Sequence, residues 1–360
     1  MTADPLPTGS TIGILGGGQL GRMLCAAASR LGMRTHVLAD GPDPPAGQLA
    51  NRVSISCYND LEILRRFAKS VDVATYEFEN IPASTIDTVA GFCPVRPGRS
   101  ALVASQDRLV EKSFLRDIGV DVAPFVGIEN RSELLDAAKA IGFPAILKSR
   151  RLGYDGKGQA RLRTVHDVER AMNAVGNKPA ILEQHVAFDL EISVIGARAV
   201  RGSKVCYNPG ENVHENGILR TTRVPARISN EIENRAVSIS ETIMDMLDYV
   251  GVIGVEFFVS GEELLVNEFA PRVHNSGHWT QNGCAIDQFE QHIRAICNWP
   301  LGDARRHADV TMVNIIGKEV TTVQELARKS DHAIHLYGKS EARPGRKMGH
   351  VNKISPTSGG

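Results

Sequence analysis

The chain has 360 residues, enough for two or three domains of about 100–200 residues each. Lys and Arg together number 41, and so do Asp and Glu, so the formal net charge is zero. This balance disfavours a nucleic-acid or acidic-membrane binder, which needs excess positive charge. Apolar residues at 42% and charged residues at 23% exclude a disordered or collagen-like chain. The composition indicates a globular protein that can bury real cores.

The first residues and the cysteines give information on the cellular location of the protein. Residues 1–10 carry neither a basic start nor an apolar run, so we expect no signal peptide. No stretch approaches the roughly 18 apolar residues of a membrane helix. The six cysteines lack CxxC spacing, which disfavours a disulfide framework or a zinc site. We therefore expect a cytoplasmic protein with reduced thiols.

The first part of the chain alternates between strand and helix patterns. Apolar runs at 11–15, 35–39 and 71–76 predict buried strands, and segments with helical spacing lie between them. Such alternation is typical of a parallel, doubly wound sheet. We expect a first domain of this kind over residues 1–104.

From about residue 107 the pattern changes, because neighbouring strands are separated by short turns instead of helices. This favours an α+β domain with largely antiparallel sheets over residues 105–298. Shorter strand and helix patterns at 310–316, 321–328 and 332–337 predict a small β-rich third domain over 299–360. The helices of the middle domain are expected at 107–118, 132–141 and 232–247, and its strand pairs at 145–149 with 159–163, 190–195 with 204–207 and 252–259 with 264–269.

A glycine-rich loop, Gly16-Gly-Gly-Gln-Leu-Gly21, follows the first predicted strand and opens the first predicted helix. It satisfies GxGxxG, and Asp40 stands 19 residues beyond Gly21. Backbone N–H groups at a helix N-terminus attract phosphate, so a nicotinamide-dependent dehydrogenase is one interpretation. Another phosphate-bearing ligand and a purely structural turn are the others. The motif by itself does not choose among them.

A second glycine-rich segment, 153–159, stands between two predicted strands, the first of which contains Lys148 near its end. It is not a Walker A loop, because the glycine spacing differs and a strand follows. Glycines let the backbone approach a ligand closely, while Lys148 and Lys157 supply charge. The segment favours a lid over a polyphosphate, with an exposed flexible hairpin as the alternative.

Two glutamates, Glu256 and Glu268, lie in otherwise apolar strands of one predicted hairpin. If the connecting loop is centred on Glu262, the two residues stand opposite each other with their Cβ atoms about 5 Å apart. Burying such charges without a partner costs several kcal/mol. Mg²⁺ prefers a few carboxylates together with substrate phosphates. The hairpin therefore predicts a magnesium site, with two solvated glutamates on an exposed edge as the alternative.

Taken together, these segments resemble the ATP-grasp superfamily and, within it, the N5-carboxyaminoimidazole ribonucleotide synthetase family. The run His274-Asn-Ser-Gly-His-Trp-Thr280 is the most specific part, and Val273 stands where a proline is expected. The resemblance implies an ATP-grasp fold, α/β plus α+β, with an N-terminal doubly wound parallel sheet domain and a small C-terminal β-rich domain. The stretches that carry it are 16–23, 75–80, 106–108, 153–159, 267–280, 337–339 and 343–350.

The resemblance also implies an activity, that of an ATP-dependent carbon–nitrogen ligase of de novo purine biosynthesis. Such an enzyme carboxylates 5-aminoimidazole ribonucleotide with bicarbonate, through carboxyphosphate, and releases ADP and phosphate. ATP and Mg²⁺ (or Mn²⁺) are the expected cofactors and a homodimer the expected assembly, with no nucleic-acid or membrane partner. Another ATP-grasp ligase, such as a formate-dependent glycinamide ribonucleotide transformylase, is the nearest alternative. An ATP-binding sensor or scaffold without turnover is the alternative from another class.

The same resemblance implies roles for individual residues. The implied ATP-binding residues are Arg108, Lys148, Gly153, Tyr154, Asp155, Gly156, Lys157, Gly158, Gln159, Glu183, Gln184, His185, Val186, Glu191, His214, Asn267 and Glu268. The implied ribonucleotide-binding residues are Gln19, Glu77, Tyr154, Asp155, Arg272, Lys339, Arg346 and Lys347. The implied catalytic residues are Lys157, Arg272, His274 and Asn275, and the implied metal ligands are Glu256 and Glu268. Ordinary surface histidines at 185 and 214, and a solvated basic loop at 339–347, are the plainer alternatives.

Overall fold

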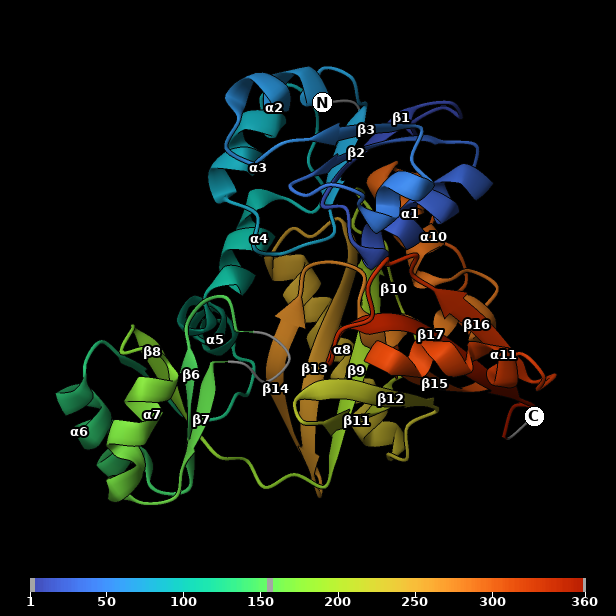
Figure 1. Ribbon diagram of the computed structural model, residues 1–360. Helices are drawn as coiled ribbons and strands as arrows, with labels where there is room; N and C mark the ends of the chain where they lie inside the picture. The colour runs from blue at the N-terminus through green and yellow to red at the C-terminus, as the bar shows by residue number, and fades with distance from the viewer. Residues whose placement is uncertain (1–3, 154–157, 359–360) are drawn as a thin grey trace.

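The computed structural model describes residues 4–153 and 158–358, and Figure 1 shows how its elements are arranged. The N-terminal part confirms the predicted parallel sheet, with strand order β3-β2-β1-β4. Asp60 caps the helix after β3 by accepting hydrogen bonds from the amides of Glu62 and Ile63. The elements are β1 (Thr11–Leu15), α1 (Gln19–Arg30), β2 (Arg34–Ala39), η1 (Pro45–Gln48), β3 (Arg52–Ile55), α2 (Leu61–Ala68), β4 (Val73–Tyr76), α3 (Ala83–Ala90) and α4 (Arg99–Gln106).

A small antiparallel sheet follows, with strand order β5-β8-β6-β7, and it forms a separate unit at the lower left of Figure 1. Helices α6 and α7 pack on this sheet through Leu134, Ala138, Ala171 and Met172, which are all buried. The predicted hairpin of strands 145–149 and 159–163 is confirmed. The elements are α5 (Arg108–Asp117), β5 (Phe125–Ile128), α6 (Arg131–Ile141), β6 (Ala145–Ser149), β7 (Gln159–Leu162), η2 (Val165–Asp167), α7 (Val168–Ala174) and β8 (Ala180–Gln184).

A nine-stranded sheet, β14-β13-β9-β11-β12-β15-β17-β16 with β10 paired to β9, forms the rest of the molecule. The two other predicted hairpins are present, as β9 with β10 and β13 with β14. The elements are β9 (Leu190–Arg198), β10 (Lys204–Cys206), β11 (Gly210–Glu215), β12 (Ile218–Val224), α8 (Asn230–Met246), β13 (Gly251–Ser260), β14 (Glu263–Ala270), η3 (Asn275–Gly277), α9 (Thr280–Gly283), α10 (Gln288–Ile296), β15 (Asp309–Ile316), η4 (Gly317–Thr322), α11 (Val323–Leu326), β16 (His332–Leu336) and β17 (Lys347–Ser355).

The C-terminal strands continue the sheet of the middle region, because β15 pairs with β12, for example Thr221 with Val313. The division of the chain at residues 104 and 298 therefore stays a prediction. The helix expected at 321–328 is wrong in extent: a 3₁₀ helix precedes only four α-helical residues, α11. None of the residues of α11 is buried, so little packing stabilises a longer helix there.

The sequence patterns did not predict several elements that surround the site, namely β11, β12, β17 and helix α10. Helix α10 lies between the N-terminal region and the large sheet, where it contacts α1 and β13. In the core that α10 helps to form, the buried Trp279 ring meets the ring of Tyr207 edge to face, with the ring centres 6.2 Å apart. Within residues 4–153 and 158–358, no helix combines the length and the hydropathy that crossing a bilayer requires.

Candidate active site

Glu256 on β13 and Glu268 on β14 are directly opposite each other, as predicted. The predicted reason, a loop centred on Glu262, is wrong. Ser260 pairs with Glu263, so the turn holds two residues, and that register alone would place Glu256 opposite residue 267. A β-bulge between Glu256 and Phe257 shifts the register by one residue and brings the two carboxylates together. Bulges of this kind are frequent beside active sites, where they redirect a side chain.

The two carboxylates have different electrostatic surroundings. Arg108, at the start of α5, donates to Glu268 Oε2 at 2.6 Å. Although burial opposes ionisation, this guanidinium lowers the pKa of Glu268 to about 2. Burial and the neighbouring Glu268 carboxylate raise the pKa of Glu256 to about 7. His274 Nε2 lies 3.5 Å from Glu256 Oε1. The pair therefore holds one firmly ionised carboxylate and one that lacks sufficient positive charge beside it.

Lys148 on β6 and Glu183 on β8 form a buried ion pair. Lys148 Nζ donates to Glu183 Oε2 at 2.8 Å, and Lys112 Nζ, on α5, lies 3.8 Å from the same oxygen. Burial opposes ionisation, but these two ammonium groups prevail and lower the pKa of Glu183. Lys112 is 1% exposed and also donates to the carbonyl oxygen of Val266. The sequence reasoning missed Lys112, because a lysine within an amphipathic helix gives no sign of burial.

At the end of β8, two backbone amides already make hydrogen bonds within the small sheet. The amide of Gln184 donates to the carbonyl of Pro124 at 2.8 Å, and that of His185 to the carbonyl of Pro144 at 3.1 Å. Val186 follows, half-buried. On the large sheet, His214 Nδ1 and Glu191 Oε2 form a short contact between β11 and β9. Burial opposes the charge on this histidine, but Glu191 prevails and raises the pKa of His214.

The second glycine-rich segment begins at the end of β6. Tyr154, Asp155, Gly156 and Lys157 lie outside the described residues. Gly158 has φ of +69°, and a Cβ there would lie 2.5 Å from Ser149 Oγ, so a glycine is required. Gln159 pairs with Lys148 across the hairpin.

Asp107 anchors the residues that connect β6 to this segment. It accepts hydrogen bonds from Arg150 Nε and Nη2, both at 2.9 Å, and from Arg151 Nε at 3.3 Å. The amide of Arg108 in turn donates to the carbonyl of Arg150 at 2.9 Å. The segment is thereby fixed to the start of α5, whose first residue pairs with Glu268.

The first glycine-rich loop carries its own anion. Glu77, directly after β4, accepts hydrogen bonds from the amides of Gly18 at 2.8 Å and Gly21 at 3.3 Å. A Cβ at Gly16 or Gly18 would lie within 2.8 Å of this carboxylate. Burial raises the pKa of Glu77, opposed by the two amides. Since the chain's own carboxylate occupies the position where a dinucleotide phosphate would bind, the geometry disfavours the dehydrogenase interpretation.

The segment after β14 brings three predicted residues to the same place. Arg272 forms a short ion pair with Glu79 and donates to the carbonyl of Val273 at 3.1 Å. His274 Nδ1 lies 2.8 Å from Ser276 Oγ, and burial together with Arg272 lowers the pKa of His274 to about 3. Both side-chain polar atoms of Asn275 are buried without a hydrogen-bond partner among the described residues. This segment therefore presents a fixed cation, a neutral imidazole and an unsatisfied amide.

The basic residues of the C-terminal loop are partly engaged with the loop itself. Lys339 Nζ donates to the carbonyl of Lys347 at 2.7 Å and lies 5.5 Å from the centre of the Tyr337 ring. Arg346 Nη1 donates to the carbonyl of Glu341 at 2.9 Å. Lys347, the first residue of β17, opposes the raised pKa of His214 and of Glu256 through its positive charge. Gln19, the first residue of α1, is half-buried next to the glycine loop.

One cavity brings several of the predicted residues together: Arg108, Gly153, Glu268, Arg272 and His274 all line it. Glu256 adjoins them, because it is opposite Glu268 and lies 3.5 Å from His274. The Lys148–Glu183 and His214–Glu191 pairs are close enough to act electrostatically on this site: Lys148 contributes to the lowered pKa of Glu268, and His214 opposes the raised pKa of Glu256. Further residues of the cavity wall had been given no role from the sequence. Five of them lie within the stretches that carry the resemblance, namely Glu79, Asn80, Gln106, Phe269 and Ala270. The others lie outside those stretches, namely Ser105, Glu111, Arg150 and Leu152.

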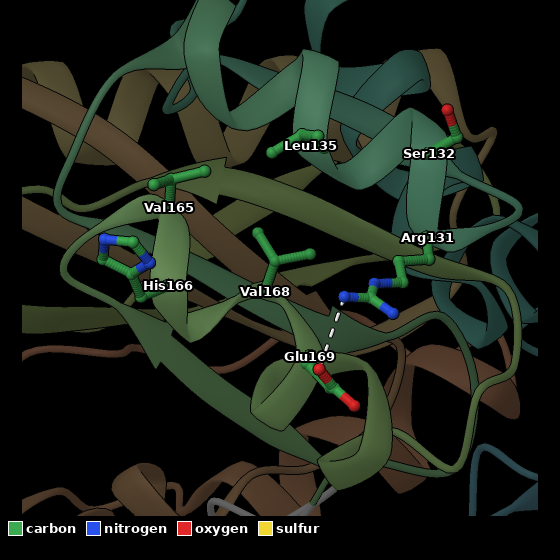
Figure 2. A pocket seen from close by; sticks show the side chains of 7 residues that line it. All are labelled: Arg131, Ser132, Leu135, Val165, His166, Val168 and Glu169. Carbon is green, nitrogen blue, oxygen red and sulfur yellow. Dashed lines mark hydrogen bonds and ion pairs between the residues drawn. The ribbon is translucent and has the colours of Figure 1, made fainter.

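A second hollow of about 520 Å³ lies on the outer side of the small sheet, between α6 and α7 (Figure 2). Its charged residues Arg131 and Glu169 pair with each other at 3.3 Å, and both side chains are exposed. Leu135, Val165 and Val168 form its apolar side. None of the described residues predicted for the site lines this hollow, and several of the predicted residues line the other cavity.

The carboxylate pair meets the requirements of a divalent cation. Glu256 and Glu268 face each other and are half-buried, and the raised pKa of Glu256 marks a deficit of positive charge between them. Asn267 Oδ1, next to Glu268, is buried without a hydrogen-bond partner among the described residues. Across those residues no group of three or more His, Cys, Asp or Glu side chains forms a complete metal site. Two carboxylates that leave positions for substrate phosphates are what Mg²⁺ prefers.

Comparison with protein families gives three matches that cover most of the chain. Residues 9–106 match the ribonucleotide synthetase preATP-grasp domain, residues 113–289 the ATP-grasp domain, and residues 310–359 the phosphoribosylaminoimidazole carboxylase C-terminal domain. These models, in this order, mark the chain as an ATP-grasp enzyme.

Individual relatives narrow the assignment. The N5-carboxyaminoimidazole ribonucleotide synthase of Brucella melitensis biotype 1 is 49% identical over 359 residues, covering 99% of each chain. A crystal structure of an N5-carboxyaminoimidazole ribonucleotide synthetase with ADP has a TM-score of 0.95 at 40% identity, covering 99% of this chain and 95% of that one. The Aspergillus clavatus enzyme in complex with ADP and 5-aminoimidazole ribonucleotide has a TM-score of 0.91 at 31% identity, covering 97% and 95%. The chain belongs to the N5-carboxyaminoimidazole ribonucleotide synthase family.

Proposed function

We propose that this protein carboxylates 5-aminoimidazole ribonucleotide with bicarbonate at the expense of ATP, in de novo purine biosynthesis. The products are N5-carboxyaminoimidazole ribonucleotide, ADP and phosphate. Membership of the family supports this function. The observation that carries it in this chain is the facing pair Glu256 and Glu268, held beside Arg108 and at the cavity that His274 and Arg272 also line.

ATP binds between the small sheet and the large sheet in this proposal. Lys148 and Arg108 neutralise its phosphates, while Gly153–Gln159, including Lys157, covers them. Because the amides of Gln184 and His185 donate within the small sheet, adenine recognition falls to the backbone of Val186 and the carbonyls of the segment starting at Glu183. Glu191, oriented by His214, accepts hydrogen bonds from the ribose hydroxyls.

Mg²⁺, or Mn²⁺ in its place, would be held by Glu256 and Glu268, with Asn267 adjacent. When bound, it supplies positive charge that the transferred phosphoryl group needs. Arg108 keeps Glu268 ionised and therefore ready to act as a ligand. The glutamate pair thus belongs to an enzyme that holds transferable phosphate, which favours turnover over a sensing role.

The ribonucleotide binds between the N-terminal sheet and the C-terminal loop. Lys339, Arg346 and Lys347 bind its 5′-phosphate, and Gln19 and Glu77 contact the rest of the molecule together with Tyr154 and Asp155. Glu77 presents a carboxylate that the amides of Gly18 and Gly21 hold in place. Arg272, paired with Glu79, lies at the junction between this compartment and the phosphates.

Bicarbonate binds beside His274 and Asn275. The unsatisfied amide of Asn275 offers one donor and one acceptor, which match the carbonyl and hydroxyl oxygens of bicarbonate. A bicarbonate oxygen attacks the γ-phosphorus of ATP, ADP leaves, and carboxyphosphate forms. The lid excludes water from this mixed anhydride, and the exocyclic amine of the ribonucleotide then takes up its carboxyl carbon while phosphate leaves.

The assembly and the location follow the same assignment. We propose three domains, at residues 1–104, 105–298 and 299–360, in a cytoplasmic homodimer whose partners are small-molecule substrates. The family assignment supports these statements, and the three matched models end and begin close to the proposed boundaries.

Phosphate release from ATP tests the proposal directly. The purified protein with ATP and Mg²⁺ is expected to release phosphate rapidly only when 5-aminoimidazole ribonucleotide and bicarbonate are both present. Rates that do not respond to either compound would contradict the function. Glycinamide ribonucleotide with formate serves as the control pair, and stimulation by that pair instead would favour the transformylase alternative.

A further inference from the structure

Gln288, the first residue of α10, is completely buried and pairs with the backbone of His274. Its Oε1 accepts a hydrogen bond from His274 N at 2.9 Å, and its Nε2 donates to His274 O at 2.8 Å. The side-chain amide thus satisfies both backbone groups of one residue, as a neighbouring strand would. Nε2 also lies 3.0 Å from His278 Nδ1, so its second hydrogen has a partner as well.

The turn from 274 to 280 is built around this amide. A Cβ at Gly277 would lie 2.6 Å from Gln288 Oε1, so only glycine leaves space there. Thr280 Oγ1 donates to the carbonyl of Gly277 at 2.6 Å and accepts from the amide of Gln288 at 3.1 Å. Backbone and side chain of Gln288 therefore hold both ends of the same turn.

The position of the His274 ring depends on that turn. Its Nδ1 lies 2.8 Å from Ser276 Oγ, which accepts a hydrogen bond from Ser193 Oγ on β9 at 2.7 Å. Its Nε2 lies 3.5 Å from Glu256 Oε1. Since Ser276 belongs to the turn that Gln288 holds, a shift of the backbone would move the ring and its hydroxyl partner together.

We infer that Gln288 is a positioning residue for His274, and that it acts on the carboxylation reaction without contacting the substrates. The inference rests on the proposed function, in which His274 lies beside bicarbonate. Without the amide, the N–H and C=O of His274 lose their partners in a buried setting, and the turn relaxes to recover them. Displacement of a reacting group by about 1 Å can lower a rate about 100-fold.

Gln291, three residues further along the same helix, provides a matched control. It is equally buried, and its Nε2 donates to Gly302 O at 2.9 Å while its Oε1 accepts from Gly302 N at 2.8 Å. Both glutamines therefore make the same pair of hydrogen bonds to one residue's backbone. Only Gln288 makes them to the segment that carries His274.

The test compares Gln288→Met with Gln291→Met, because methionine has a similar shape and lacks the amide. Both variants are expected to lower the melting temperature. Gln288→Met is expected to lower kcat about 100-fold with KM for ATP changed less than about 3-fold, whereas Gln291→Met keeps kcat within about 3-fold. Gln288→Glu keeps the acceptor for His274 N, and its kcat is expected to lie between that of Gln288→Met and that of the unmodified protein. If Gln288→Met does not fold, the kcat of Gln288→Glu is compared with that of Gln291→Glu instead.

A double variant distinguishes positioning from general destabilisation. On a His274→Ala background, Gln288→Met is expected to lower kcat no further, because its effect passes through the missing imidazole. A full additional loss there, or an equal kcat loss in Gln291→Met, would overturn the inference. Absence of phosphate release stimulated by ribonucleotide and bicarbonate in the unmodified protein would instead refute the proposed function.

Discussion

The two glycine-rich loops look alike in sequence and differ in what the structure places against them. The loop at Gly16–Gly21 opens a helix, and its amides at Gly18 and Gly21 are taken by the Glu77 carboxylate. The loop at 153–159 lies between strands β6 and β7, and Asp107 accepts hydrogen bonds from Arg150 and Arg151, which lead into it. A glycine loop can bind a phosphate only where the chain does not supply an anion of its own. The anion that occupies the first loop comes from a residue far away in sequence: Glu77 stands 59 positions after Gly18.

The largest expected effect tests the nucleotide side of this comparison. Glu268→Ala is expected to lower ATP turnover about 1,000-fold, because it removes one of the facing carboxylates and leaves Arg108 unpaired. The measurement is phosphate release with all three substrates present. Glu263→Ala, an exposed glutamate on the same strand, is the control and is expected to be unchanged. Turnover near the unmodified rate in Glu268→Ala would refute the metal assignment.

The next effect concerns the compartment beside the first loop. The double variant Lys339→Ala with Arg346→Ala is expected to raise KM for the ribonucleotide about 100-fold and to leave ATP affinity within about 3-fold, because two phosphate-binding cations are lost. Initial rates at varied ribonucleotide and ATP concentrations separate the two constants. A collapse of ATP binding would show that the basic loop belongs to the nucleotide side.

A smaller effect is expected from the anion within the first loop. Glu77→Gln replaces an acceptor with an amide that cannot accept from both Gly18 and Gly21 equally well, so the loop loosens. We expect KM for the ribonucleotide to rise about 10-fold while kcat at saturation changes little. NADH titration of the same variant is expected to give no fluorescence change. Tight NADH binding would instead support the interpretation of this loop as a dinucleotide-binding site.

The smallest effect is on stability alone and lies in the sheet that carries the first loop. Burial lowers the pKa of His36 to about 4, with its ring between the hydroxyls of Ser70 and Ser54. Because the unfolded chain takes up this proton near pH 6.5, the stabilisation is present above that pH and is lost as the pH falls toward 4. Between pH 7 and pH 5, the free energy of unfolding is expected to fall by about 2 kcal/mol more in the unmodified protein than in His36→Gln. Urea denaturation at both values measures it, and equal pH dependence in the two proteins would contradict the assignment.

The sequence predicted those parts of the site that local patterns mark. The alternation of strands and helices defined the parallel sheet, and two glutamates in otherwise apolar strands marked the hairpin of Glu256 and Glu268 as a candidate cation site. The bulge that makes the two residues face each other could not be predicted, because it depends on packing between β13 and its neighbours and not on a local motif. Strand β17 was also missed, since its basic residues and glycine obscure an alternating pattern.

Residues that act through partners distant in the chain were out of reach of sequence reasoning. Lys112 reads as one solvated face of a helix, yet it is buried beside Glu183. Gln288 lies 14 residues from His274 in a segment with no motif, and its two backbone hydrogen bonds exist only in the folded turn. Charge, burial and spacing in sequence do not determine such contacts, which follow from how β14 and α10 meet.

The central claim is that Glu256 and Glu268 share a divalent cation with a triphosphate. The most direct measurement is Mn²⁺ binding, followed by its electron paramagnetic resonance signal, with and without a non-hydrolysable ATP analogue. The account predicts that Mn²⁺ binds tightly only with the nucleotide present, and that Glu256→Gln and Glu268→Gln each weaken this binding at least about 10-fold. Unchanged Mn²⁺ binding in both variants would contradict it.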